Sequence, residues 1–274
     1  MAKQASAIVM AGNGTNCELE TAHACRLGGF DRVDIVAIWE LLNGDTTLDP
    51  YDFLALPGGF LDGDDLGSGK AQANRILHSS DTKSGKPFIE QFTRFIRAGK
   101  LLLGICNGFQ LMIKLGLVPA LEGKYTVQQA TLAGNDSGKF EDRWALLRVN
   151  PASPCVFTRG IDTIYLPVRH GEGKFIARDK GVLDRIKAAH QVVAVYLNQQ
   201  TLQPTQEYPD NPNGSQSAVA GICDPTGRLF GLMPHPEAYT HRTNHPRWTR
   251  ENLPEEGAGV ALFRNACEYV KKSL

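Results

Sequence analysis

Short apolar runs alternate with amphipathic segments through the first 116 residues of the chain. The apolar runs have the length of buried strands, and glycine-rich loops at 12–14 and 58–59 follow two of them. The segments between the runs carry apolar residues at helical spacing. This alternation predicts an α/β fold with a mainly parallel sheet. The expected strands are residues 5–11, 33–38, 53–56 and 101–105, and the expected helices are residues 17–27, 87–98 and 107–116, with Thr15 or Asn16 capping the first helix.

The pattern changes after residue 124, where short apolar runs are separated by turn residues. An Asp-Pro-Thr-Gly turn at 224–227 joins two apolar runs and predicts a hairpin. We therefore expect additional, antiparallel strands in the second half. The expected strands are residues 125–132, 144–149, 163–168, 174–177, 192–197, 218–223 and 228–233, and the expected helices are residues 182–189 and 259–274.

No linker or repeat divides the chain, so we expect a single domain over residues 1–274. Residues 61–86 are polar and rich in Gly, Asp and Ser, which predicts a surface insertion in this domain. Residues 240–274 are expected to form a C-terminal extension.

The stretch around Cys106 has the pattern of a nucleophile on a strand-to-helix turn. Gly104 and Gly108 flank the cysteine, and such a turn needs small neighbours because its backbone is strained and tightly packed. The N-terminus of the following helix would stabilise a thiolate. A buried structural cysteine fits the same stretch equally well. The nucleophile interpretation therefore depends on finding a base.

Composition limits the partners, metals and cellular location that we expect for the protein. The 29 basic residues equal the 29 acidic ones, so charge does not indicate nucleic acid or an anionic membrane as a partner. No apolar run approaches the length of a membrane span. The six cysteines lack CxxC pairs, as is typical of reduced thiols, and His241 and His245 lack a surrounding ligand cluster, so we expect no metal. The expectation is a soluble cytoplasmic protein.

His235 and Glu237 supply the base that Cys106 needs. In an extended segment, side chains two residues apart point to the same face, although Pro236 intervenes here. The histidine would take the thiol proton and the carboxylate would orient its ring. Together with Pro57-Gly58-Gly59, these elements occur in the order found in class I (triad) glutamine amidotransferases, which the sequence resembles.

The resemblance implies a class I glutamine amidotransferase-like, flavodoxin-like three-layer fold. It also implies that Cys106 attacks the side-chain amide of L-glutamine, which releases ammonia and leaves a thioester. By position, His235 would be the general acid/base and Glu237 its orienting carboxylate. The backbone N–H groups of Gly59 and Asn107 would form the oxyanion hole. The substrate-binding residues that the resemblance implies are Gln110, Gly58, Phe60, Asn135 and His170.

Other segments are similar to the glutaminase subunit or domain of phosphoribosylformylglycinamidine synthase. The most discriminating are His-Gly-Glu-Gly at 170–173 and Asn-Pro-Asn-Gly-Ser at 211–215, and the second is expected on the face toward the synthase. The resemblance implies a larger partner subunit that binds ATP, Mg²⁺ and formylglycinamide ribonucleotide, and it allows a small third subunit. It implies no cofactor in this chain.

Two other functions fit parts of the pattern. A cysteine hydrolase or peptidase of a related α/β fold also places a cysteine on such a turn, but commonly lacks the late His-Pro-Glu. A non-catalytic amidotransferase-like binding subunit would keep the fold alone, although all three triad positions are filled here.

Overall fold

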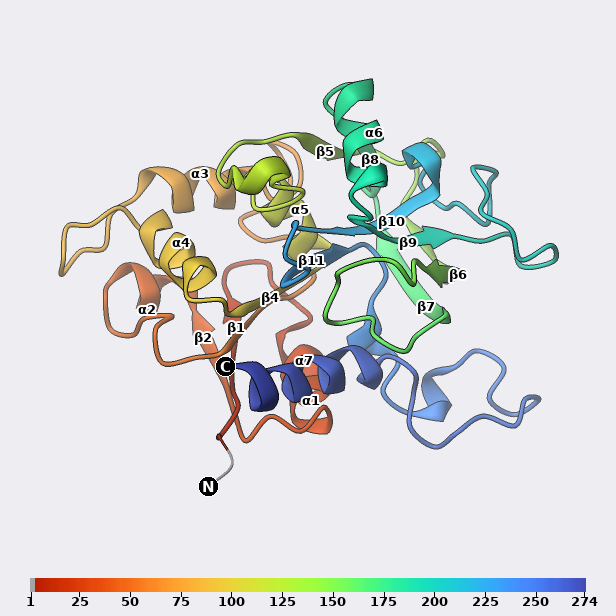
Figure 1. The fold of residues 1–274 in the computed structure, drawn as a ribbon, viewed down its shortest axis with the longest axis horizontal. Coiled ribbons are helices and arrows are strands. Elements are labelled where there is room, and N and C mark those ends of the chain that lie inside the picture. The colour runs from red at the N-terminus through yellow and green to blue at the C-terminus, as the bar shows by residue number, and fades with distance from the viewer. Residues whose placement is uncertain (1–2) are drawn as a thin grey trace.

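The computed structural model describes residues 3–274. Most of its strands join one sheet, in the order β2-β1-β3-β4-β11-β10-β9-β6-β7 (Figure 1). Neighbouring strands from β2 to β11 run parallel, and those from β11 to β7 run antiparallel. These strands are β1 (Ser6–Ala11), β2 (Arg32–Ala37), β3 (Phe53–Leu56), β4 (Leu101–Ile105), β6 (Glu141–Val149), β7 (Thr163–His170), β9 (Val192–Tyr196), β10 (Val219–Cys223) and β11 (Leu229–Leu232). The prediction of a parallel sheet extended by antiparallel strands is confirmed.

A separate antiparallel pair, β5 (Ala130–Ala133) with β8 (Lys174–Ala177), lies beside the main sheet. The sequence pattern placed the start of β5 at residue 125, five residues too early. Residues 125–129 are not part of a strand, because Thr126 has a left-handed backbone and the Tyr125 hydroxyl donates to Asp224 Oδ2 instead.

Helices cover both faces of the parallel half. Helices α1 and α7 pack together on one face, while α3 packs against α4 and α5 on the other (Figure 1). Right-handed crossovers in opposite directions along the sheet produce this three-layer arrangement. The helices are α1 (Glu18–Leu27), α2 (Ile38–Leu42), α3 (Lys70–His78), α4 (Ile89–Arg97), α5 (Asn107–Lys114), α6 (Lys180–Ala188) and α7 (Val260–Ser273).

Residues 61–86 are more than the surface insertion that their composition predicts. They contain α3, which buries Ala73 and Ile76 completely. The polar residues before α3 form the loop that carries Asp64 and Ser68 toward the C-terminal end of the sheet. The pattern missed α3 because its buried face is narrow.

One other local prediction needs correction. Neither Thr15 nor Asn16 caps α1: Cys17 is the residue at its N-cap, and no side chain caps it there. The Thr15 hydroxyl instead accepts a hydrogen bond from the Gly12 N–H, which closes the glycine-rich loop. At the other end of the chain, the helix expected over residues 259–274 is present as α7, and it packs on the fold with Phe263 and Val270 fully buried.

Candidate active site

The carboxyl ends of adjacent parallel strands bring the predicted site together. Gly58 and Gly59 follow β3, Cys106 follows β4, and His235 comes three residues after β11. Since β4 lies between β3 and β11 and all three run parallel, their loops meet at one edge of the sheet. This is where open α/β sheets bind ligands.

Cys106 occupies the strained turn that the sequence predicts. Its φ and ψ are 51° and −105°, a conformation that is costly for a residue with a side chain. A Cβ at Gly108 would overlap the carbonyl oxygen of Leu56, and one at Gly104 would lie 2.7 Å from the carbonyl oxygen of Gly108. The turn therefore forms only because both flanking residues are glycine. It leaves the Cys106 thiol at the N-cap of α5, from where it donates a long, 3.6 Å hydrogen bond to the Arg169 carbonyl.

His235 and Glu237 form a buried pair. His235 Nδ1 donates to Glu237 Oε1 at 2.6 Å, although only His235 is extended and Glu237 lies in the following 3₁₀ turn. Burial by itself lowers the pKa of His235, but the charge of Glu237 and the neighbouring Cys106 and Cys17 thiols raise it well above its ordinary value. His235 Nε2 is buried and has no hydrogen-bond partner among the described residues, so it is free to exchange a proton with Cys106.

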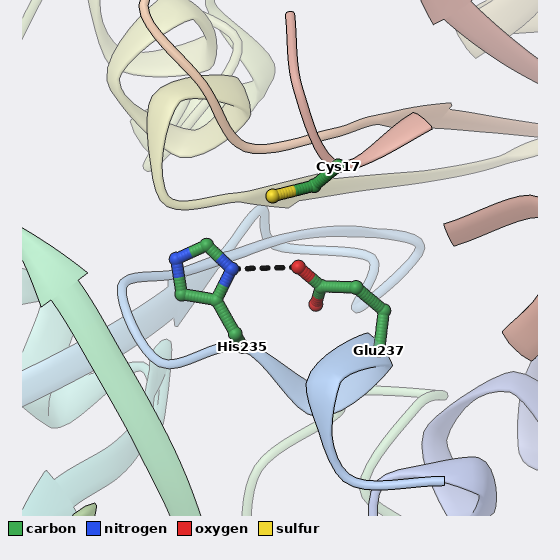
Figure 2. Close-up of side chains that lie close together, drawn as sticks. All are labelled: Cys17, His235 and Glu237. Carbon is green, nitrogen blue, oxygen red and sulfur yellow. Dashed lines mark hydrogen bonds and ion pairs between the residues drawn. The ribbon is translucent and has the colours of Figure 1, made fainter. Parts of the chain in front are cut away.

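Cys17 is a site residue that the sequence analysis missed. Figure 2 shows its sulfur pointing toward His235 and Glu237 from the turn before α1. Its thiol donates to Asn16 Oδ1 at 3.1 Å, and burial raises its pKa. The signal was present, since Cys17 follows the glycine-rich loop after β1, at the same edge of the sheet as the other loops.

Cys17, His235 and Glu237 also form the only group of three or more potential metal ligands found in residues 3–274. Their ligand atoms all lie within 4.8 Å of one another. A thiolate, an imidazole and a carboxylate would suit Zn²⁺. However, an ion bound there would separate His235 Nδ1 from Glu237, which are already paired. The expectation of no metal stays a prediction for this group.

Two backbone N–H groups beside Cys106 have no acceptor among the described residues. Among the hydrogen bonds formed within residues 3–274, neither the Gly59 N–H nor the Asn107 N–H is a donor. The Asn107 side chain ties their loops together, because its Oδ1 accepts from the Leu61 N–H at 3.1 Å and its Nδ2 donates to Gln110 Oε1 at 2.9 Å. The two N–H groups are therefore available to a ligand, and their role as an oxyanion hole stays a prediction.

Cys106 lines two small cavities. One, of about 230 Å³, is lined by Cys17 and His235, and the other, of about 190 Å³, is lined by Gln110 and His170. Both fall below the roughly 300 Å³ at which pockets for drug-sized ligands begin, so they suit a metabolite the size of an amino acid. The residues common to both are Gly59, Phe60, Cys106, Phe140 and Arg169.

Comparison with known proteins decides the family. The family described as the CobB/CobQ-like glutamine amidotransferase domain matches residues 4–270. The chain belongs to this family. It is a glutamine amidotransferase, as the sequence motifs indicate.

Relatives of this amidotransferase match it over nearly their whole length. The phosphoribosylformylglycinamidine synthase subunit PurQ of Dehalococcoides mccartyi is 42% identical over 261 residues, covering 94% of this chain and 95% of the relative. The PurQ subunit of Methanococcus maripaludis strain C7 is 40% identical over 275 residues, covering 97% of each. A structure of PurLQS from Thermotoga maritima contains a chain that is 28% identical, with a TM-score of 0.70 and coverage of 97% of this chain and 99% of that one.

A second solved structure, a glutamine amidotransferase from Thermotoga maritima, supports the fold alone. It is 15% identical with a TM-score of 0.53, and it covers 99% of this chain and 100% of that one. The predicted amidotransferase-like three-layer fold is confirmed.

Some of the predicted substrate-binding residues line the cavity beside Cys106, and the others lie outside it. Gln110, Phe60 and His170 line the cavity beside Cys106. Gly58 lies behind His235, where a Cβ would come 2.7 Å from the ring. Asn135 lines neither cavity. Its Oδ1 accepts from His170 Nδ1 at 3.1 Å and from the Gly173 N–H at 3.0 Å, so it positions His170.

Gln110 is a buried residue rather than a solvent-facing one. Its Nε2 donates to the Glu172 carbonyl at 2.5 Å, which joins α5 to the His-Gly-Glu-Gly segment. His170 is also buried, and burial together with the nearby charge of His235 lowers its pKa to about 3. The ring is therefore neutral, and because Nδ1 donates to Asn135, its Nε2 is an acceptor without a partner in the described chain.

Residues 211–215 are largely buried. Asn211, Asn213 and Ser215 are buried, and the Ser215 hydroxyl accepts from the Phe175 N–H at 2.9 Å. The segment is thus bonded to β8, and its place on the face toward the synthase stays a prediction.

Proposed function

We propose that this amidotransferase is the glutaminase subunit of a phosphoribosylformylglycinamidine synthase. It hydrolyses L-glutamine and delivers ammonia to a larger subunit, which converts formylglycinamide ribonucleotide to the amidine with ATP and Mg²⁺. The observation that carries the chemistry is Cys106 on its strained turn, sharing a cavity with His235, whose Nδ1 is bonded to Glu237. The similarity to PurQ subunits supports the destination of the ammonia.

The reaction follows from the positions of these groups. Cys106 Sγ attacks the side-chain amide carbon of glutamine, and His235 Nε2 takes the thiol proton. The negative charge on the amide oxygen is stabilised by the N–H groups of Gly59 and Asn107, a kind of contact worth about 3 kcal/mol when one donor is removed. His235 then returns the proton to the nitrogen, which leaves as ammonia.

A glutamyl thioester on Cys106 remains after ammonia has left. Water attacks the thioester carbonyl while His235 Nε2 accepts a proton from the water, and glutamate leaves as the thiol is restored. Glu237 holds the ring so that Nε2 faces the reacting atoms and stabilises its charged form through both steps. The chain's own residues supply every group that these steps require.

The same proposal includes the partner and the location of the protein. ATP and Mg²⁺ bind to the synthase subunit, with or without a small third subunit. Cytoplasmic location is supported by the six cysteines, all of them within the described residues and free. No helix in residues 3–274 has the length and hydrophobicity needed to cross a bilayer.

Replacing Cys106 by Ala tests the chemistry. Ammonia release from L-glutamine, measured with the partner synthase present, is expected to fall by at least about 10⁴-fold, because the nucleophile is lost. Far-UV circular dichroism of the variant should match that of the wild type. Retained ammonia release would refute the assignment of the nucleophile.

The same assay tests the role of the partner. We expect weak glutaminase activity from the isolated chain and strong stimulation by the synthase with its ribonucleotide and ATP. Full activity of the isolated chain would contradict this gating. Hydrolysis of a peptide or ester panel in place of glutamine would favour the cysteine hydrolase alternative.

A further inference from the structure

Cys17, His235 and Glu237 form a buried cluster with unsatisfied polar atoms. The three residues are 9%, 2% and 3% exposed. His235 Nε2 and Glu237 Oε2 are buried and have no hydrogen-bond partner among the described residues. Buried polar atoms without a partner are rare, and each needs an explanation. The proposed reaction accounts for Nε2, whereas Glu237 Oε2 is an acceptor that the reaction does not use.

The Cys17 sulfur lies on the Nδ1 side of the His235 ring. A Cβ at Gly58 would come 2.7 Å from His235 Cε1, 3.3 Å from Cys17 Sγ and 3.4 Å from His235 Nδ1. Figure 2 shows the sulfur beside the hydrogen bond that joins His235 to Glu237. The sulfur, a ring nitrogen and a carboxylate oxygen all lie within 4.8 Å of one another. The three groups therefore converge on one position.

This spacing fits Zn²⁺ after a small rearrangement. Zn²⁺ binds thiolate sulfur at about 2.3 Å and imidazole nitrogen or carboxylate oxygen at about 2.0–2.2 Å, so the ligand atoms of a tetrahedral site are about 3.4–3.6 Å apart. His235 Nδ1 and Glu237 Oε1 are 2.6 Å apart, and they would have to separate by about 0.8 Å. Cys17 and His235 also line the cavity of about 230 Å³, from which water can supply a fourth ligand.

Zinc binding would leave the charge of the cluster unchanged. With His235 protonated, Glu237 ionised and Cys17 as a thiol, the cluster is neutral. One zinc ion would replace the proton on His235 Nδ1 and the thiol proton of Cys17, because a metal deprotonates a coordinated thiol outright. Zn²⁺ with a thiolate, a carboxylate and a neutral ring is again neutral, so the buried cluster gains no uncompensated charge.

We propose that Cys17, His235 and Glu237 form an inhibitory zinc site, with the ion bound by Cys17 Sγ, His235 Nδ1 and a carboxylate oxygen of Glu237. The ion is not a resident cofactor, because it breaks the hydrogen bond through which Glu237 orients His235. A ring bound through Nδ1 keeps its proton on Nε2, so it cannot accept a proton from Cys106 or from water. The inhibition rests on the proposed function, since it assumes that His235 is the base.

Titration with zinc chloride tests the inhibition in the wild-type subunit with its synthase. Zinc should inhibit ammonia release from L-glutamine, and the chelator TPEN, which leaves Mg²⁺ free, should restore it. Amidine synthesis from ammonium chloride bypasses the glutaminase, so the same zinc concentration should leave it unchanged. Wild-type ammonia release that zinc does not inhibit would overturn the proposal.

Cys17→Ser removes the thiol ligand. Its zinc inhibition constant, measured against its own zinc-free rate, should rise at least about 100-fold, because loss of even an outer-shell partner of a ligand weakens metal binding by about 10- to 100-fold. His241→Asn is the matched control. His241 is exposed and lies 4.0 Å from Glu255 Oε1, and its replacement should leave the zinc inhibition constant unchanged.

Cobalt binding tests the site without activity. Co²⁺ added to the Cys106→Ala protein should give a thiolate-to-cobalt charge-transfer band in the near ultraviolet, and zinc chloride should remove the band by displacing the cobalt. The band should be absent when Cys17→Ser is added to Cys106→Ala. Thermal melts establish that each variant is folded.

The outcomes separate this site from its rivals. Equal zinc inhibition of wild type and Cys17→Ser, or no cobalt band in the Cys106→Ala protein, would place the ion on Cys106 and overturn the proposal. A cobalt band that persists without Cys17 would also overturn it. Failure of the wild-type enzyme to release ammonia in the absence of zinc would instead overturn the proposed function, and the cobalt band would still decide the metal site.

Discussion

Two features of the site have opposite effects on the pKa of His235. Its ring is almost completely buried, which disfavours the charged form, while Glu237 is bonded to Nδ1 at 2.6 Å and favours it. The charges prevail, so the pKa of His235 is raised. The protonated ring therefore persists to a higher pH than in a free histidine, and it can stabilise a thiolate on Cys106.

Glu237→Gln should expose this effect directly. The amide keeps the size of the side chain but removes the charge, so the pKa of His235 should fall. Because the protonated ring is then lost at a lower pH, the alkaline limb of the kcat/KM profile should move to lower pH. kcat should drop by about 10²- to 10⁴-fold. Ammonia release measured across the pH range checks both effects.

Glu255→Gln is the control for that experiment, because Glu255 is an exposed carboxylate outside both cavities. It should leave the profile unchanged. An unshifted alkaline limb in Glu237→Gln would show that the carboxylate does not set the protonation of His235.

Cys17 lies beside His235, as a catalytic nucleophile would, but we expect its thiol to be unreactive. Burial and the charge of Glu237 raise its pKa, outweighing the contact with His235. A glutamine-like electrophile should therefore label Cys106 at least about tenfold faster than Cys17. Peptide mass spectrometry after partial labelling measures this ratio. The prediction would be wrong if Cys17 in the Cys106→Ala protein were labelled as fast as Cys106 is in the wild type.

At the scale of elements, the crossing of α1 and α7 joins the C-terminal segment to the fold. Gly28 ends α1, and a Cβ there would lie 2.7 Å from both the Cβ and the carbonyl carbon of Phe263. Its φ of −69° is open to any residue, so the requirement for glycine is purely one of space. The two helices approach closely because this side chain is absent.

Gly28→Ala should consequently destabilise the protein. Overpacking at such a contact costs about 1–3 kcal/mol in the free energy of unfolding, which chemical denaturation can measure. Gly134→Ala is the matched control, since a Cβ there meets nothing within 4 Å, and it should change the free energy of unfolding by less than about 0.5 kcal/mol. Equal effects of the two substitutions would mean that α7 is not held by this contact.

The loop and helix of residues 61–86 show why an element can mislead in sequence. Their polar composition predicts a solvent-exposed segment. However, Asp64 and Ser68 of the loop line the cavity beside Cys106, and Ile76 of α3 is buried. Composition reports the average environment of a segment, whereas function depends on which few of its atoms face inward.

At the scale of the whole molecule, one sheet crosses both halves of the chain. β4 from the first half is paired along its length with β11 from the second, and Cys106 and His235 lie beyond these two strands. The catalytic pair therefore exists only when the second half completes the sheet. Neither half can assemble the site by itself.

This continuity should make unfolding a single transition. Leu103→Ala removes a fully buried side chain from β4 and should lower the free energy of unfolding by about 2–5 kcal/mol. Far-UV circular dichroism and tryptophan fluorescence should shift together, because Trp39 and Trp144 lie in opposite halves of the chain. Two separated transitions would contradict the prediction of a single domain over residues 1–274.

The sequence by itself determined the strand and helix pattern of the parallel half, the turn at Cys106 and the pairing of His235 with Glu237. These features depend on local spacing: apolar runs of strand length, two glycines that a close turn requires, and two side chains in one short segment. The family motifs added the order of the loops. Local spacing could not predict α3 or the N-cap of α1, because both depend on residues that are distant in sequence and contact these segments in the fold.

Only the tertiary structure decided which distant side chains surround the cysteine. Cys17, Asp64 and Glu172 are separated from Cys106 by tens of residues, and local spacing alone does not show that they lie beside it. The order of parallel strands brings their loops to one edge of the sheet. Side chains that local spacing cannot connect therefore line cavities that share Cys106.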